Sequence, residues 1–137
     1  MIRSRGVILV SACLLGVRCR YDGTKREIPA KIGKLGDRGK CLIPVCPEQL
    51  GGLPTPRPKN YITWKGDNPC VVNEEGREVT IQFLKGAEET LRIARLLGVK
   101  RAIFKSRSPS CGEDGITTRF LRREGIEVEV IDAPGEG

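Results

Sequence analysis

Cysteine is the residue type that gives this sequence its reactive chemistry, and histidine is absent from it. Without His, a Ser-His-Asp triad, a Cys-His dyad and Cys/His zinc fingers are excluded. Acid–base work then falls to Asp, Glu, Lys, Tyr or water. An even number of cysteines predicts disulfides in a secreted chain but metal binding or thiol chemistry in the cytoplasm. The six are Cys13, Cys19, Cys41, Cys46, Cys70 and Cys111.

The N-terminus allows two interpretations of Cys13. Arg3 and Arg5 precede an apolar run that ends in small residues, as in a lipoprotein signal. That run, Gly6–Ala12, is at the lower limit of a signal core of roughly 7 to 15 residues, and the chain stays apolar after it. A short buried strand rich in β-branched residues explains the run better. Since no stretch reaches the roughly 18 apolar residues that span a bilayer, we expect a cytoplasmic protein and keep the signal as the lesser alternative.

Short apolar runs that predict strands alternate with segments of helical periodicity. The runs are Val7–Ala12, Leu42–Val45, Arg101–Lys105 and Glu127–Ile131. The clearest helix is Val79–Leu97, and others are expected over Ile116–Arg123 and, with interruptions, Lys25–Arg38. In the first of these, the residues expected to face the core are Ile81, Leu84, Leu91, Ala94 and Leu97.

The alternation predicts one α/β domain over residues 1–137. Its core is a small open parallel sheet of about four strands with flanking helices, of the Rossmann or flavodoxin-like type. Prolines and glycines between Pro44 and Pro69 indicate a long ordered loop or a small insertion. The following residues, Cys70–Val79, predict a β-hairpin that turns at Glu75-Gly76.

Three cysteines follow the carboxyl ends of predicted strands, where ligands bind in open parallel sheets. Cys13 follows the first strand, Cys46 the second, and Cys111 lies in the loop after the third. We expect these three to converge. Cys41 opens a strand at the opposite end and Cys70 begins the hairpin, so both are interpreted as small buried residues. The position of Cys19, in the first loop, leaves its role open.

Three converging thiolates in a protein without His fit an iron–sulfur cluster better than zinc. No C-x-x-C motif is present, which excludes the usual ribbon and thioredoxin-like patterns. Three protein ligands in place of four leave one iron open to substrate, as catalytic zinc sites keep an open position.

Polar residues beside these cysteines are candidates for catalysis. Glu48, two residues after Cys46, is either a general base or a solvated loop carboxylate. Hydroxyls and backbone amides beside Cys111 predict a cradle for an anion or a polarised carbonyl; the hydroxyls are those of Ser106, Ser108 and Ser110. Tyr21 and Asp22, just before a glycine, are interpreted as turn residues.

The net charge of +7, from 24 Lys and Arg against 17 Asp and Glu, favours an anionic partner such as a nucleotide, a phosphate or RNA. A basic but otherwise featureless surface is an equal alternative, since no long run of like charge occurs. Tyr and Trp are too few for a dedicated RNA-binding module that stacks bases; they are Tyr21, Tyr61 and Trp64.

Three motifs carry a resemblance to a known family: VSACLLGVRCRYDG, PVCPEQLGGLPTPRP and KSRSPSCG. Together they resemble the DUF523 family, which includes the TudS-type thiouracil desulfidases. The resemblance runs from Val10 to about Ile126, and the stretch FLKGAEETLRIARLLGVKRAIFKSRSPSCG strengthens it.

The resemblance implies a [4Fe-4S] cluster held by Cys13, Cys46 and Cys111, with assisting roles for Glu48 and Ser108. The open iron would bind the sulfur of a thiolated pyrimidine as a Lewis acid, and activated water would attack the ring carbon, so that sulfur leaves as sulfide without redox change. The implied partner is a thiolated base or nucleotide, or a thiolated tRNA. The segment after the last motif is expected to border the pocket, and it is shorter than the family pattern, which puts the substrate's identity in doubt.

Two other functions remain open. One is a non-catalytic carrier that stores or delivers a cluster or sulfide. The other, less favoured, is a zinc-binding or RNA-binding module. A carrier would bind the cluster without turnover. A colourless protein with stoichiometric zinc would favour the zinc-binding or RNA-binding module.

Overall fold

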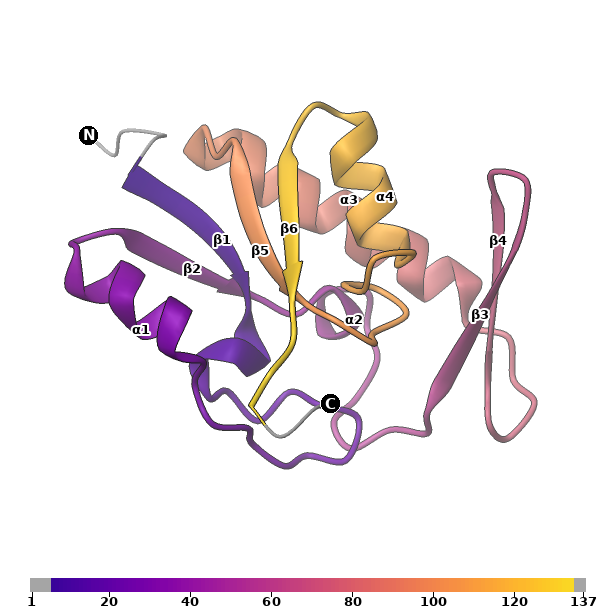
Figure 1. Ribbon diagram of the computed structural model, residues 1–137. Helices are drawn as coiled ribbons and strands as arrows, with labels where there is room; N and C mark the ends of the chain where they lie inside the picture. The colour runs from indigo at the N-terminus through magenta and orange to yellow at the C-terminus, as the bar shows by residue number, and fades with distance from the viewer. Residues whose placement is uncertain (1–5, 135–137) are drawn as a thin grey trace.

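The computed structural model describes residues 6–134, and its four-stranded sheet is parallel throughout. The strands are β1 (Val7–Ser11), β2 (Cys41–Val45), β5 (Arg101–Lys105) and β6 (Glu127–Ile131), in the spatial order β2-β1-β5-β6. Three helices cover the sheet: α1 (Ala30–Asp37) on one face, α3 (Thr80–Leu97) and α4 (Ile116–Arg123) on the other (Figure 1). The expected α/β fold with a small parallel sheet is therefore confirmed.

Alternation along the strands supplies the two faces of the sheet, because successive side chains point to opposite sides. Leu9 of β1 belongs to the cluster that contains Leu91 of α3 and Leu121 of α4. Its neighbour Val10 belongs to the cluster that contains Ile32 of α1. Strand β1 is buried along its whole length, as a central strand covered on both faces must be.

The apolar run near the N-terminus thus forms β1, as the strand interpretation predicts. Arg3 and Arg5, the basic residues of the signal interpretation, lie outside the described residues. Within residues 6–134, no helix has the length and apolar character needed to cross a membrane.

The strand order creates a switch point between β1 and β5. From β1 the chain passes through α1 to β2 on one side, and from β2 it returns through α3 to β5 on the other. Ligands of open parallel sheets bind beyond the carboxyl ends of the strands at such a point. The segments that leave β1 and β5 there are the 3-10 helix Ala12–Leu15 and the loop that begins at Ser106.

The β-hairpin lies earlier in the chain than expected. Strands β3 (Asn60–Lys65) and β4 (Asn68–Asn73) pair antiparallel and stand apart from the main sheet (Figure 1). The turn predicted at Glu75-Gly76 is present, and Glu78 after it pairs antiparallel with Val72, but this pairing is a single bridge because α3 begins at Thr80. The strand that pairs with β4 along its whole length is β3, and it lies in a stretch whose prolines suggest a loop.

Helix α3 buries Leu91 and Ala94 as predicted, but its first half differs from the prediction. Ile81 and Leu84 are 77% and 41% exposed, whereas Phe83 and Ala87 are buried. Gly86 lies on the buried face, where it lets α3 approach α2 closely. Helix α1 is also shorter than the expected Lys25–Arg38, because it begins only after a proline.

The long proline- and glycine-rich segment contains a short helix, α2 (Pro47–Leu50), that touches α3 through two glycines. A Cβ added at Gly51 would lie 1.9 Å from the carbonyl oxygen of Gln82. One added at Gly86 would lie 1.9 Å from the carbonyl oxygen of Pro47. No side chain fits at these distances, so the two backbones are in contact and the glycines fix the position of α2.

Gly86→Ala is expected to lower the free energy of unfolding by about 1–3 kcal/mol, the usual cost of overpacking. Gly33→Ala in α1 is the matched control, because no atom lies within 4 Å of the added Cβ. That control should be neutral or stabilising by up to about 1 kcal/mol. Equilibrium unfolding in urea measures both, and a Gly86→Ala protein as stable as the wild type would refute the backbone contact.

Candidate functional site

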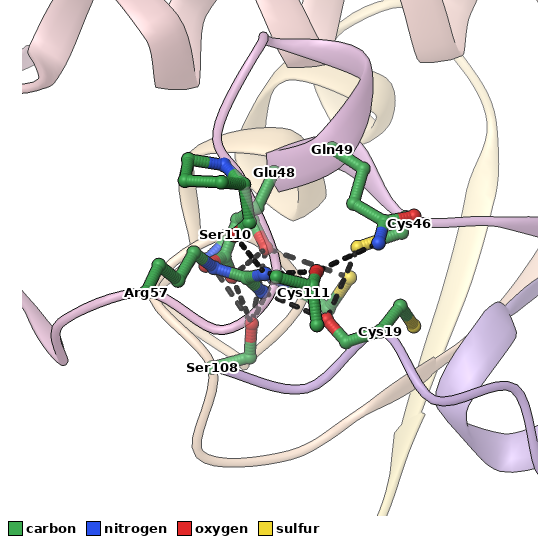
Figure 2. Close-up of polar contacts among 10 residues, drawn as sticks. Cys19, Cys46, Glu48, Gln49, Arg57, Ser108, Ser110 and Cys111 are labelled. Carbon is green, nitrogen blue, oxygen red and sulfur yellow. Dashed lines mark hydrogen bonds and ion pairs between the residues drawn. The ribbon is translucent and has the colours of Figure 1, made fainter. Parts of the chain in front are cut away.

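The loops beyond the carboxyl ends of β1, β2 and β5 enclose a cavity of about 470 Å³. This volume is within the roughly 300–1,000 Å³ of small-molecule sites. Cys13, Cys46 and Cys111 all line it, so the three predicted cysteines do converge. Cys19 lines the same cavity and is buried, which settles where this residue lies. Figure 2 shows Cys19, Cys46 and Cys111 around the polar centre of the site.

Hydrogen bonds among the thiols favour the thiolate at two of the three strand-end cysteines. The Cys19 thiol lowers the pKa of Cys46 to about 7, against the opposing effect of burial. The same thiol is the main cause of the lowered pKa of Cys13, with help from the charge of Lys105. Because it donates to both neighbours, the pKa of Cys19 itself is raised. Burial raises the pKa of Cys111.

Glu48, on α2, is a buried carboxylate in an ion pair. It is 8% exposed, and Arg57 Nε donates to its Oε1 at 3.0 Å. The hydroxyl of Ser110 donates to Oε2 at 2.9 Å, and that of Ser108 lies 3.5 Å from the same oxygen (Figure 2). The interpretation of Glu48 as a solvated loop carboxylate is therefore wrong.

The serine motif forms only part of the predicted cradle. Ser108 Oγ accepts hydrogen bonds from the backbone amides of Ser110, at 3.2 Å, and Cys111, at 3.0 Å. These amides are therefore engaged by a side chain of the motif, and the predicted anion cradle from them is wrong. Ser106 turns away and donates to Asp132. Of the three serines of this motif, Ser108 and Ser110 line the cavity.

The short segment after Cys111 is tied back to the loop before it. Gly112 N donates to the Ser108 carbonyl at 2.8 Å, and Thr118 Oγ1 donates to the Cys111 carbonyl at 2.9 Å. A Cβ at Gly115 would lie 2.4 Å from the Ser110 carbonyl oxygen. None of residues 112–118, all of them described by the structure, lines the cavity. The expectation that this segment borders the pocket is wrong.

The two cysteines interpreted as small buried residues are not buried. Cys41 lies at the opposite end of the sheet, as expected, but it is exposed. Cys70 is half-buried in β4, with its Sγ 3.6 Å from Glu78 Oε1. The turn at Tyr21 and Asp22 is confirmed by a hydrogen bond from the amide that follows them, although the Tyr21 ring also lines the cavity.

Sequence reasoning missed the cationic lining of the cavity. Arg57, at 9%, and Lys105, at 8%, are both almost fully buried, and the only signal of Arg57 in the sequence is an arginine between prolines in the segment that also carries Glu48. The ring of Tyr21 lies between Arg20, at 5.9 Å, and Lys59, at 5.3 Å. The lining cations are Arg20, Arg26, Arg57, Lys59, Lys105 and Arg107, and Glu48 is the lining carboxylate.

Cysteine thiols, a buried carboxylate and cations around one switch-point cavity define a small α/β enzyme that holds a reactive group at the end of its sheet. The chain belongs to the 2-thiouracil desulfurase family, whose model matches residues 8–133. The family expected from the three motifs is thereby confirmed.

Two similar proteins extend the comparison. The "Uncharacterized protein YbbK" of Bacillus subtilis (strain 168) is 35% identical to this chain, and the match covers 89% of this chain and 93% of that protein. The solved structure of a "[4Fe-4S]-dependent thiouracil desulfidase TudS (DUF523Vcz)" has 40% sequence identity and a TM-score of 0.78. That match covers 90% of this chain and 89% of the solved one.

Proposed function

We propose that the protein is a cytoplasmic, single-domain, [4Fe-4S]-dependent desulfidase that hydrolyses thiolated pyrimidines to the oxo-pyrimidine and sulfide. The observation that carries the proposal is one cavity lined by three strand-end cysteines and a buried carboxylate. Membership of the 2-thiouracil desulfurase family and the likeness to the TudS structure support it.

The donor set fits an iron–sulfur cluster held by Cys13, Cys46 and Cys111. All three offer soft sulfur ligands from separate strand ends, and two have a lowered pKa. Within residues 6–134, no three Cys, Asp or Glu side chains are placed to hold a single metal ion. A cluster needs a wider spacing, since each thiolate binds a different iron. When bound, it supplies an iron without a protein ligand, a Lewis acid for the substrate's sulfur.

The chain's own acid–base group for the reaction is Glu48. Its Oε1 is held by Arg57, so Oε2 is the oxygen that can take a proton from the attacking water. Ser108 and Ser110 place hydroxyls beside Oε2 and orient that water. Water adds to the thiocarbonyl carbon and gives one proton to Glu48. As the carbon–sulfur bond breaks, the sulfur leaves with the proton from Glu48, and the hydroxyl on the carbon loses its own proton to solvent and becomes the carbonyl. Thiocarbonyl and water thus give carbonyl, hydrosulfide and a proton, and no electrons are needed.

The charge of the cavity favours a substrate that carries phosphate. Among residues 6–134, six Lys and Arg side chains line it against one carboxylate, and this excess of positive charge attracts an anionic ligand. The ring of Tyr21 and the half-exposed ring of Tyr61 are available to stack on a base or a sugar. We therefore place thiouridine nucleotides ahead of the free base, with thiolated tRNA as the larger alternative.

Sulfide release under anaerobic conditions tests the proposal. The reconstituted protein should release sulfide from 4-thiouracil and, with a higher kcat/KM, from 4-thio-UMP. A higher kcat/KM for a thiolated tRNA would identify RNA as the substrate. If a fully loaded cluster released no sulfide from any thiolated base, nucleotide or tRNA, the desulfidase proposal would fail.

The position of Cys19 favours a second candidate, the carrier, since a fourth thiol in the cavity can close the cluster to substrate. We place Cys19 instead as a thiol that donates to Cys13 and Cys46, the role in which its own pKa is raised. Cys19→Ser keeps a donor but offers a poor iron ligand. It is expected to retain wild-type iron and an open iron that binds added thiolate, seen by electron paramagnetic resonance. Loss of iron in Cys19→Ser would instead indicate that Cys19 is a fourth ligand that closes the cluster to substrate, and would favour the carrier.

A further inference from the structure

Arg57 is a buried cation whose hydrogen bonds all go to the site or its supporting loop. It is 9% exposed. Nε donates to Glu48 Oε1 at 3.0 Å, and Nη2 donates to the Cys19 carbonyl at 3.0 Å. Nη1 donates to the Pro54 carbonyl at 3.1 Å and to Thr55 Oγ1 at 3.0 Å. Burying a guanidinium is costly unless it is paired and hydrogen-bonded, and here it is both.

These contacts divide the two oxygens of Glu48 between different partners. Oε1 faces the guanidinium, and Oε2 faces the hydroxyls of Ser110 and Ser108 (Figure 2). The carboxylate cannot rotate without breaking the contact to Arg57 or the contact to Ser110. Oε1 therefore holds the Glu48 carboxylate in place through Arg57, and Oε2 remains available beside the serines that line the cavity.

The same guanidinium also ties Glu48 to the thiols. The Cys19 carbonyl that accepts from Arg57 lies 3.8 Å from the Sγ of Cys46. Arg57 therefore bridges the helix that carries Glu48 and the loop that carries Cys19, beside a strand-end cysteine. In Figure 2 it lies between Glu48 and the Cys19 segment.

We propose that Arg57 is the positioning residue that makes Glu48 Oε2 the proton-accepting atom and holds it at a fixed place relative to Cys46. This inference rests on the proposed function of Glu48 and adds a residue to it. Arginine is required because its planar fork reaches acceptors in several directions at once. Lysine would keep the ion pair with Glu48 but could not also hold the Cys19 carbonyl and the loop.

Arg57→Lys and Arg57→Ala test the inference, with Arg92→Lys on the exposed face of α3 as the matched control. In Arg57→Lys, iron content, the cluster's absorption spectrum and the affinity for substrate, followed by that absorption, should equal those of the wild type. KM should change little, whereas kcat should fall by about 10²-fold, as expected when a reacting group is misplaced by about 1 Å. Guanidinium added below denaturing concentrations should restore part of kcat in Arg57→Ala and none in Arg57→Lys.

Two results would overturn the positioning role. Wild-type kcat in Arg57→Lys would show that charge alone suffices. A loss of kcat that only follows a loss of iron would show that Arg57 merely supports the fold. A cluster-loaded wild type that releases no sulfide would instead overturn the proposed function itself, so the two failures are distinguishable.

Discussion

Glu48→Gln is expected to keep the cluster and to slow sulfide release by about 10²- to 10⁴-fold, the usual contribution of a general base. Glutamine has the shape of glutamate, and its amide oxygen can still accept from Arg57, as Oε1 does now. Its amide nitrogen, however, cannot take a proton from water. The loss should therefore appear in kcat, measured as sulfide release, while iron content and substrate affinity stay near those of the wild type.

Glu74→Gln is the matched control for this substitution, because it makes the same change of charge on an exposed residue outside the cavity. It should leave kcat unchanged. If Glu48→Gln, fully loaded with iron, kept more than about a tenth of the wild-type kcat, Glu48 would not be the base. Water bound by other groups would then have to supply the nucleophile.

Alanine at any one of Cys13, Cys46 or Cys111 is expected to abolish stable cluster binding, since two thiolates would remain to hold four irons. Iron and acid-labile sulfide should fall to background in each variant purified without oxygen. The brown colour and the broad absorption near roughly 400 nm should disappear with them. These losses should exceed those of any other single substitution in the chain, because they remove the reactive group itself.

Cys41→Ala and Cys70→Ala are the controls for the cysteine series. Both thiols lie outside the cavity, on β2 and β4, so iron content should be that of the wild type. Retention of the cluster in all three strand-end variants would contradict the assignment of Cys13, Cys46 and Cys111 as its ligands. Retention in only one of them would point to Cys19 as its replacement.

The convergence of the three cysteines was predictable because it depends on strand direction and on little else. Each follows a strand, and parallel strands end at the same edge of a sheet. Cys41 was predicted to be buried but is exposed, because burial depends on where a strand lies in the sheet. It begins β2, which is an edge strand, and strand order is a tertiary property that an apolar run does not encode.

The environment of Glu48 could not be predicted, because it depends on contacts between segments far apart in the chain. Its serine partner is 62 residues away, and α2 reaches its place through backbone contact with α3. Ile81 and Leu84 illustrate the same limit, since helical spacing marks an apolar stripe but not which neighbours will cover it. Local pattern therefore predicted the strands of the main sheet and the long helix, whereas contacts between distant segments determined the environment of Glu48.

The hydrolytic reaction at this cavity is tested most directly by the fate of a water oxygen. The loaded protein would be given 4-thiouracil in water enriched in oxygen-18, without reductant, and the products analysed by mass spectrometry and sulfide assay. We predict one sulfide released per uracil formed and one oxygen-18 atom in each uracil. Uracil without the label, or turnover that needs added reductant, would contradict the proposed mechanism.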